Sequence, residues 1–202
     1  MGPVVCMVTG SRDELGESAL LEQVARAVHS GVHLIHVRQP GLDGGPLLRL
    51  VERCVAIARG SRTRVLVGDR VDVALAAGAH GVHLRTGSLP ASRVRRIVPG
   101  GFLIGRSVHR AEEARQVTEA GGLDYLIAGT VFPTSSKPGV AGIGLDGLRA
   151  IVSVTAVPVL AIGGMTLESV EPLRQTGAAG FAAIGLFARG VPIRFDTPES
   201  VS

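Results

Sequence analysis

The stretch GVHLRTGSLPASRVRRIVPGGFLIGRSVH, residues 81–109, joins two short apolar runs through a helical segment and shows the pattern of the whole chain. Residues 81–84 and 102–105 are almost continuously apolar, as in strands that are covered on both faces. Between them, Pro90 precedes a predicted helix over residues 91–98, and proline is favoured at the start of a helix. A strand, a helix and a second strand in this order predict a parallel βαβ unit.

The same alternation extends along the chain in both directions. Strands are predicted at residues 3–9, 32–38, 64–68, 81–84, 102–105, 124–128, 157–162 and 180–184. Helices are predicted at residues 14–30, 45–60, 71–77, 91–98, 111–120, 144–154 and 166–176. Eight such units favour an α/β fold of the (βα)8 TIM barrel type over an open doubly wound sheet, because no GxGxxG turn follows the first strand.

The barrel is expected to be a minimal single domain over residues 1–186, with a short or irregular last helix. A short tail is expected over residues 187–202, where Pro192 and Pro198 interrupt any helical period. The outer helices of such a barrel offer surface for a homodimer.

Composition excludes several classes of protein. The 202 residues are 46% hydrophobic and 3% aromatic, with a net charge of +4. No apolar run approaches the length of a membrane span, and the arginines at residues 93–96 lack interleaved aromatics, so neither membrane nor nucleic acid is an expected partner. Two cysteines cannot form a disulfide framework, and the first apolar run is too short for a signal peptide, so a cytoplasmic location is expected.

The loop after the sixth strand carries the clearest chemical signal. It contains three hydroxyl residues and the only lysine of a chain whose other twenty basic residues are arginines. These residues are Thr134, Ser135, Ser136 and Lys137. Hydroxyls beside an ammonium group suit a phosphate or carboxylate, so the loop is predicted to bind substrate. An ordinary surface loop is the alternative.

Glycines follow the seventh and eighth strands, where many barrels bind phosphate through backbone N–H groups. The predicted phosphate-binding residues are Gly163, Gly164, Ile184 and Gly185. Glycine used only for turns is the alternative.

The end of the fifth strand carries Ser107 and His109, and an imidazole can take and give a proton at neutral pH. The other five histidines are predicted to lie on the surface or to be structural, and no His, Asp and Glu spacing resembles a zinc or iron site.

Four ordered motifs resemble the thiamine phosphate synthase and thiazole tautomerase superfamily of (βα)8 barrels. They are DRVDVALAAGAHGVHL (69–84), IGRSVH (104–109), VFPTSSKPG (131–139) and VPVLAIGGMT (157–166), and the similarity runs from about His36 to Phe187. This resemblance implies an enzyme of thiamine biosynthesis with a phosphorylated thiazole-type small molecule as ligand.

The synthase branch of this superfamily, also called thiamine-phosphate pyrophosphorylase, couples hydroxymethylpyrimidine diphosphate to thiazole phosphate and uses Mg²⁺. Its motif has a lysine, an asparagine and a second aspartate where this chain has Pro40, Gly68 and Ser88. Asp69, the residue that would bind the metal in this branch, remains. One carboxylate is weak support for a metal–diphosphate complex, so the sequence indicates loss of that function.

The tautomerase branch shifts a proton on a carboxythiazole phosphate and needs no metal or other cofactor. Its motifs are similar to GRSVHR and VFPTSSKPG here. This resemblance implies His109 as the proton shuttle and Arg38 as the group that holds the substrate carboxylate, with Asp69, Ser107 and the sixth loop as further substrate contacts. A thiazole tautomerase, an isomerase, is therefore the expected function.

Two other readings stay open. The first is the Mg²⁺-dependent synthase, a transferase, and the second is a non-catalytic binding or regulatory protein of the thiamine pathway. Arg85 and Arg106 replace small residues near the rim, and the sequence leaves open whether they block or reshape the pocket.

Overall fold

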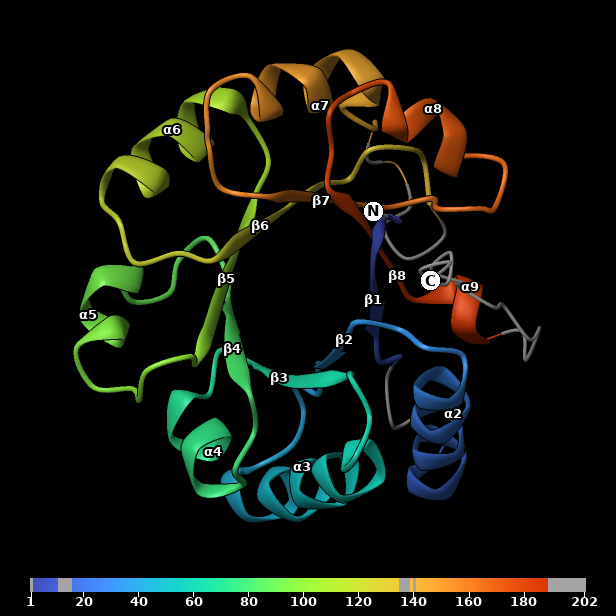
Figure 1. Ribbon diagram of the computed structural model, residues 1–202, viewed down its shortest axis with the longest axis vertical. Coiled ribbons are helices and arrows are strands. Elements are labelled where there is room, and N and C mark those ends of the chain that lie inside the picture. Colours follow the sequence, from blue (N-terminus) through green and yellow to red (C-terminus); the bar gives the residue numbers. More distant parts are fainter. Residues whose placement is uncertain (1, 11–15, 135–138, 140, 189–202) are drawn as a thin grey trace, which may run out of the picture.

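The computed structural model describes residues 2–10, 16–134, 139 and 141–188, and it shows a closed barrel of eight parallel strands (Figure 1). The strands are β1 (Val4–Val8), β2 (Leu34–Val37), β3 (Arg64–Gly68), β4 (Gly81–Leu84), β5 (Leu103–Val108), β6 (Tyr125–Gly129), β7 (Val159–Ile162) and β8 (Gly180–Ala183). They neighbour one another in sequence order, and β8 closes the ring by pairing with β1.

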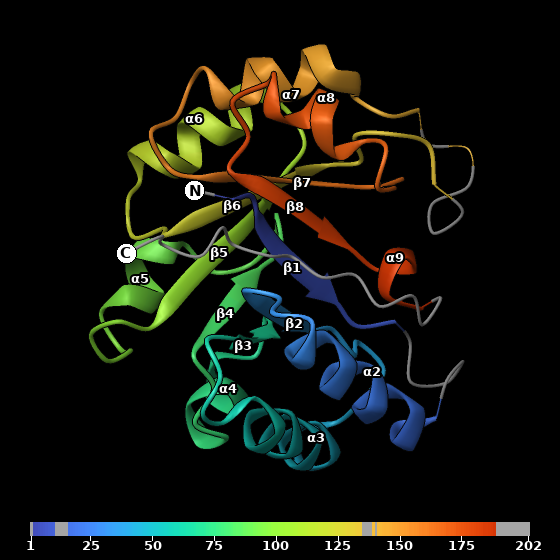
Figure 2. The same ribbon diagram turned by 45° about the vertical axis from the view of Figure 1, so that its right-hand side comes forward.

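Helices alternate with these strands along the chain. They are α2 (Glu17–His29), α3 (Gly44–Ala58), α4 (Val71–Ala76), α5 (Ala91–Arg95), α6 (Ala111–Glu119), α7 (Gly144–Val152), α8 (Val170–Arg174) and α9 (Gly185–Ala188). Both views show the helices outside the ring of strands (Figure 1 and Figure 2). The predicted (βα)8 barrel with a short last helix is confirmed. Residues 189–202, most of the predicted tail, lie outside the described residues.

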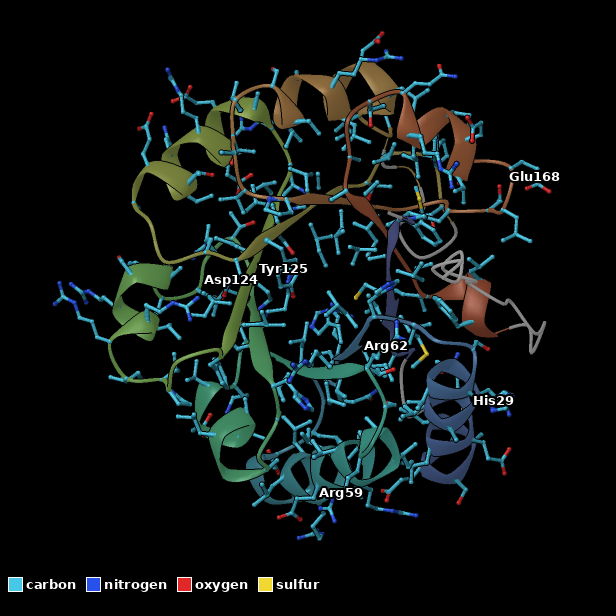
Figure 3. All side chains as sticks on the ribbon, viewed as in Figure 1. His29, Arg59, Arg62, Asp124, Tyr125 and Glu168 are labelled. Atoms are coloured by element: carbon cyan, nitrogen blue, oxygen red, sulfur yellow. The ribbon has the colours of Figure 1, made fainter. Side chains whose placement is uncertain are left out.

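Two hydrophobic clusters follow from the alternation of side chains along each strand. The larger cluster fills the space between the strands and the helices and includes Val5, Ile35 and Val67. The smaller cluster fills the barrel and includes Cys6, Leu66 and Leu160. Figure 3 shows Tyr125 inside the ring of strands, whereas His29 and Arg59 lie on the outer surface. The described helices include no segment with the length and hydropathy of a membrane-spanning helix.

Strand β5 is longer than predicted, because it ends at Val108 rather than at residue 105. Arg106 breaks the apolar pattern of the sequence, yet its side chain points away from the barrel interior. Its guanidinium donates to the backbone carbonyls of Thr86, Ser88 and Leu89 at 2.9 to 3.0 Å. A polar residue therefore fits within this strand because the loop after β4 supplies acceptors for it.

Several helices are shorter than predicted. The helix expected over residues 166–176 is only Val170–Arg174, because Pro172 is tolerated in the first turn of a helix but not further inside it. The helix expected over residues 14–30 begins at Glu17, within the described residues, and ends at His29.

Candidate functional site

The carboxyl ends of the strands form two chemically different halves of one rim. We call the ends of β2 to β4 the charged side, because Arg38, Asp69 and Arg85 follow these strands. We call the ends of β7 and β8 the glycine side, because Gly163, Gly164 and Gly185 follow them.

The loop after β6 is described only in part. Ser135, Ser136 and Lys137 lie outside the described residues, so their substrate contacts stay predictions, and Thr134 is half-buried.

Asp69 is the centre of the charged side. It has φ 63°, a left-handed conformation that Asp tolerates better than most residues. One carboxylate oxygen accepts from the Ser88 hydroxyl and from the Arg85 backbone N–H, and the other accepts from the Arg85 Nε. Burial by itself raises the pKa of the Asp69 carboxyl, but the hydrogen bonds from Ser88 and Arg85 outweigh this effect and hold the pKa below its ordinary value.

The groups around Asp69 do not fit Mg²⁺, the metal that the resemblance implies for a synthase. Mg²⁺ binds through carboxylates and water, and both Asp69 oxygens already accept hydrogen bonds from Arg85 or Ser88. Among the residues that the structure describes, no group of three or more His, Cys, Asp or Glu residues could hold a metal ion. A divalent ion at Asp69 would also lie beside the positive guanidinium of Arg85, which repels it.

A polar layer lies inside the barrel below the charged side. His83 shares hydrogen bonds with the Tyr125 hydroxyl at 3.0 Å and with Ser107 Oγ at 2.8 Å, and its ring centroid lies 4.7 Å from that of His36. Burial, and then the nearby Arg38, lower the pKa of His36 to about 4, and burial also holds the pKa of His83 well below its ordinary value. Both histidines are therefore neutral at neutral pH, and His83 positions the Ser107 hydroxyl at the rim.

His83 and Tyr125 are the site residues that sequence reasoning missed. Both are buried, and His83 links the Tyr125 hydroxyl to Ser107, a predicted substrate contact. The alternation of side chains along each strand was the available signal, because it places His83 and Ser107 at inward positions of consecutive strands.

The two residues of the expected proton-transfer chemistry have different hydrogen-bond partners. His109 is exposed, its backbone N–H donates to Glu113 at 2.8 Å, and its Nδ1 makes a hydrogen bond to the carbonyl of Gly129. Arg38 is also exposed, and its backbone N–H donates to Thr9 Oγ1 at 2.9 Å. Within the described part of the chain, no hydrogen bond or ion pair joins these two side chains.

The glycine side is built by close packing of backbone. Gly164 has φ 64°, and a Cβ there would lie 2.6 Å from the carbonyl oxygen of Pro133. Gly163 has φ 104°, and its Cβ would meet Thr130 at 2.5 Å. The backbone N–H groups of both glycines have no acceptor among the described residues. Glycine is therefore required for the turn itself, and the turn leaves amides that can bind an anion.

Comparison with known proteins covers nearly the whole barrel. The family model described as thiamine monophosphate synthase matches residues 5–187. This chain belongs to that family. A thiamine-phosphate synthase of Chlorobium luteolum is 36% identical over 201 residues, which cover 99% of this chain and 90% of the relative. One of Methanoregula boonei is 43% identical over 164 residues, covering 80% of this chain and 76% of the relative.

Solved structures agree with this family membership. A thiamine phosphate pyrophosphorylase from Pyrococcus furiosus has a TM-score of 0.79 and 31% identity, and the match covers 94% of this chain and 92% of that one. A 3-hexulose-6-phosphate synthase, at 19% identity and a TM-score of 0.70, shares the fold.

The expectation of a thiazole tautomerase is wrong, because relatives at 30% to 43% identity, which include the two described above, are named thiamine-phosphate synthases. That expectation rested on Pro40, Gly68 and Ser88, which stand where the synthase motif has a lysine, an asparagine and an aspartate, and it interpreted these replacements as loss of synthase function. The structure shows that a cation nevertheless lies on Asp69, since the Arg85 guanidinium forms an ion pair with it. The relatives described above carry the names of enzymes, so the comparisons do not favour a non-catalytic binding or regulatory protein either.

Proposed function

We propose that this protein is a thiamine-phosphate synthase, a transferase that joins hydroxymethylpyrimidine diphosphate to thiazole phosphate and releases pyrophosphate. The observation that carries the proposal is 36% identity to a synthase over 99% of the chain. Two phosphorylated substrates also match a rim that has arginines on one side and, on the other, backbone amides with no acceptor in the described part of the chain.

The reaction exchanges one bond for another. The bond between the methylene carbon of the pyrimidine and the diphosphate oxygen breaks, and its electron pair leaves with the diphosphate. The lone pair of the thiazole nitrogen forms the new C–N bond, which leaves a positively charged ring. No proton has to leave either reacting atom, so this chemistry does not require His109 as a proton shuttle.

The charged side binds the leaving diphosphate in this proposal. Arg38 and Arg85 are exposed at the ends of β2 and β4, on either side of β3. A guanidinium presents paired N–H groups that match phosphate oxygens. Ser107, fixed by His83, supplies a hydroxyl to the pyrimidine ring. Fixed donors that face the oxygen on which charge develops lower the barrier most, because they need no rearrangement during the reaction.

The glycine side binds the phosphate of the thiazole in this proposal. The turn of Gly163 and Gly164 lies next to Ile184 and Gly185, where β8 leads into α9, because β7 and β8 pair in register. The hydroxyls of the sixth loop, Thr134 among them, are further candidates for this contact.

The test is a coupling assay on the purified chain with both substrates. Formation of thiamine phosphate together with an equal amount of pyrophosphate is the expected result. Absence of both products, with and without added Mg²⁺, would contradict the proposal. A homodimer and a cytoplasmic location stay predictions, and light scattering after size exclusion tests the former.

A further inference from the structure

The Asp69 carboxylate already holds a cation that the chain itself supplies. Arg85, from the end of β4, reaches across to the end of β3 and forms an ion pair with Asp69 through Nε. We propose that this guanidinium takes the place of a divalent metal ion, binds the diphosphate of the pyrimidine substrate and allows the coupling to proceed without Mg²⁺. The inference rests on the proposed function and deepens it.

The Arg85 side chain has donors left for a ligand. Its contact with Asp69 uses Nε, and the two terminal nitrogens have no acceptor among the described residues. The side chain is 73% exposed, so these groups can be reached from solvent. Two N–H groups in one plane suit two oxygens of a phosphate, and the guanidinium keeps its charge at any physiological pH.

The backbone of Arg85 is fixed by hydrogen bonds to its neighbours. Its backbone N–H donates to Ser88 Oγ at 3.0 Å and to Asp69 at 3.3 Å, so its main chain is tied to the same cluster. The following loop is held from outside the barrel by Arg106, which donates to the carbonyls of Thr86, Ser88 and Leu89. The Arg106 side chain therefore does not enter the barrel. It acts as a positioning residue for the loop on which Arg85 and Ser88 lie.

The charges of the cluster also balance. The resemblance implies a second aspartate in the synthase where this chain has Ser88. A divalent cation with two carboxylates and a guanidinium with one carboxylate both sum to zero charge. Arg85 and Ser88 are thus complementary changes: one supplies a cation, the other removes a carboxylate that no longer has a metal to bind, and its hydroxyl donates to Asp69.

In the coupling step the Arg85 guanidinium would bind the diphosphate oxygens that receive the electron pair of the breaking C–O bond. It gives up no proton and no electrons. The step therefore balances with the two substrates alone, and no further reactant is needed.

The experiment measures binding of inorganic pyrophosphate by calorimetry, and coupling, each in excess chelator and in excess Mg²⁺. The wild-type chain is expected to bind pyrophosphate and to couple equally well in both. Arg85→Gln is expected to weaken pyrophosphate binding about tenfold to a hundredfold, the usual effect of losing a charged hydrogen bond. Arg93→Gln, which removes the same charge from the exposed face of α5, is the matched control and should leave binding unchanged.

A reciprocal variant tests the replacement directly. Arg85→Gly combined with Ser88→Asp restores a pair of carboxylates, and it is expected to bind Mn²⁺, observed by its electron paramagnetic resonance, whereas the wild type does not. Circular dichroism checks that each variant folds, and Arg85→Lys, which keeps the charge, should retain part of the pyrophosphate binding.

The outcomes separate this inference from the proposed function. Metal-free pyrophosphate binding that depends on Arg85, without any coupling, would support the role of Arg85 and contradict the synthase activity. Coupling that stops in chelator, or equal pyrophosphate binding by Arg85→Gln and wild type, would overturn the role of Arg85 while leaving the synthase proposal in place.

Discussion

The charged side and the glycine side of the rim offer two solutions to the same task of binding a phosphate. On the charged side, Asp69, Arg85 and Ser88 form a cluster of side chains above a layer of buried histidines. On the glycine side, Gly163 and Gly164 bring bare backbone against Thr130 and Pro133, and the strands below carry Leu160 and Ala182. The difference teaches that polar side chains on the charged side can be replaced by others of complementary charge. The glycine side, in contrast, requires residues without a side chain.

The largest expected effect comes from removing both arginines of the charged side. Arg38→Gln with Arg85→Gln should lower kcat/KM for the pyrimidine diphosphate by about a hundredfold to ten-thousandfold, because two charged hydrogen-bonding groups are lost. Steady-state kinetics of the coupling reaction measure this. The control pair Arg93→Gln with Arg96→Gln removes equal charge from exposed positions, and an equal loss there would show that overall charge, and not contact, is responsible.

The buried histidines should make stability depend on pH. His36 has a pKa of about 4 in the folded protein against an ordinary value of 6.5, so the unfolded chain binds a proton in this interval that the folded chain does not. Stability is therefore full above about pH 6.5 and falls by about 3 kcal/mol as the pH drops toward 4. Urea unfolding at several pH values measures it. His36→Gln should reduce the slope, and an unchanged slope would exclude His36 as a source.

Adding a single methyl group to the glycine side should lower the free energy of unfolding. Gly164→Ala forces an alanine to φ 64° and places its Cβ 2.7 Å from the Cβ of Phe132, so a loss of about 1–3 kcal/mol in the free energy of unfolding is expected. The KM for thiazole phosphate should rise as well. Gly185→Ala is the matched control, since its Cβ would have no atom within 4 Å. Equal destabilisation by the two variants would contradict the packing argument.

The smallest effect is expected at His109. His109→Asn should lower kcat by less than about tenfold, because it loses one hydrogen bond, to the carbonyl of Gly129, and the coupling needs no proton transfer there. Steady-state kinetics with saturating substrates are sufficient. Complete loss of activity in a folded variant would restore a proton-transfer role for this imidazole.

Much of the fold was predictable from local pattern. Eight apolar runs separated by helical segments specify a parallel barrel, and the carboxyl ends of those strands specify the rim. The boundaries were less accurate: β5 extends to Val108 because carbonyls of the loop after β4 accept hydrogen bonds from Arg106, and these carbonyls lie 17 to 20 residues earlier in the chain.

The sequence by itself determined the barrel and the list of groups at its rim, because strand and helix periodicity are local properties of the chain. Only the tertiary structure decided which of these groups meet. Asp69 forms an ion pair with Arg85, sixteen positions away, and Arg106 contacts the loop after β4 while Ser107 faces inward. Such pairings depend on the register between strands and on the direction in which each side chain leaves the pleat, and neither is written in the residue types alone.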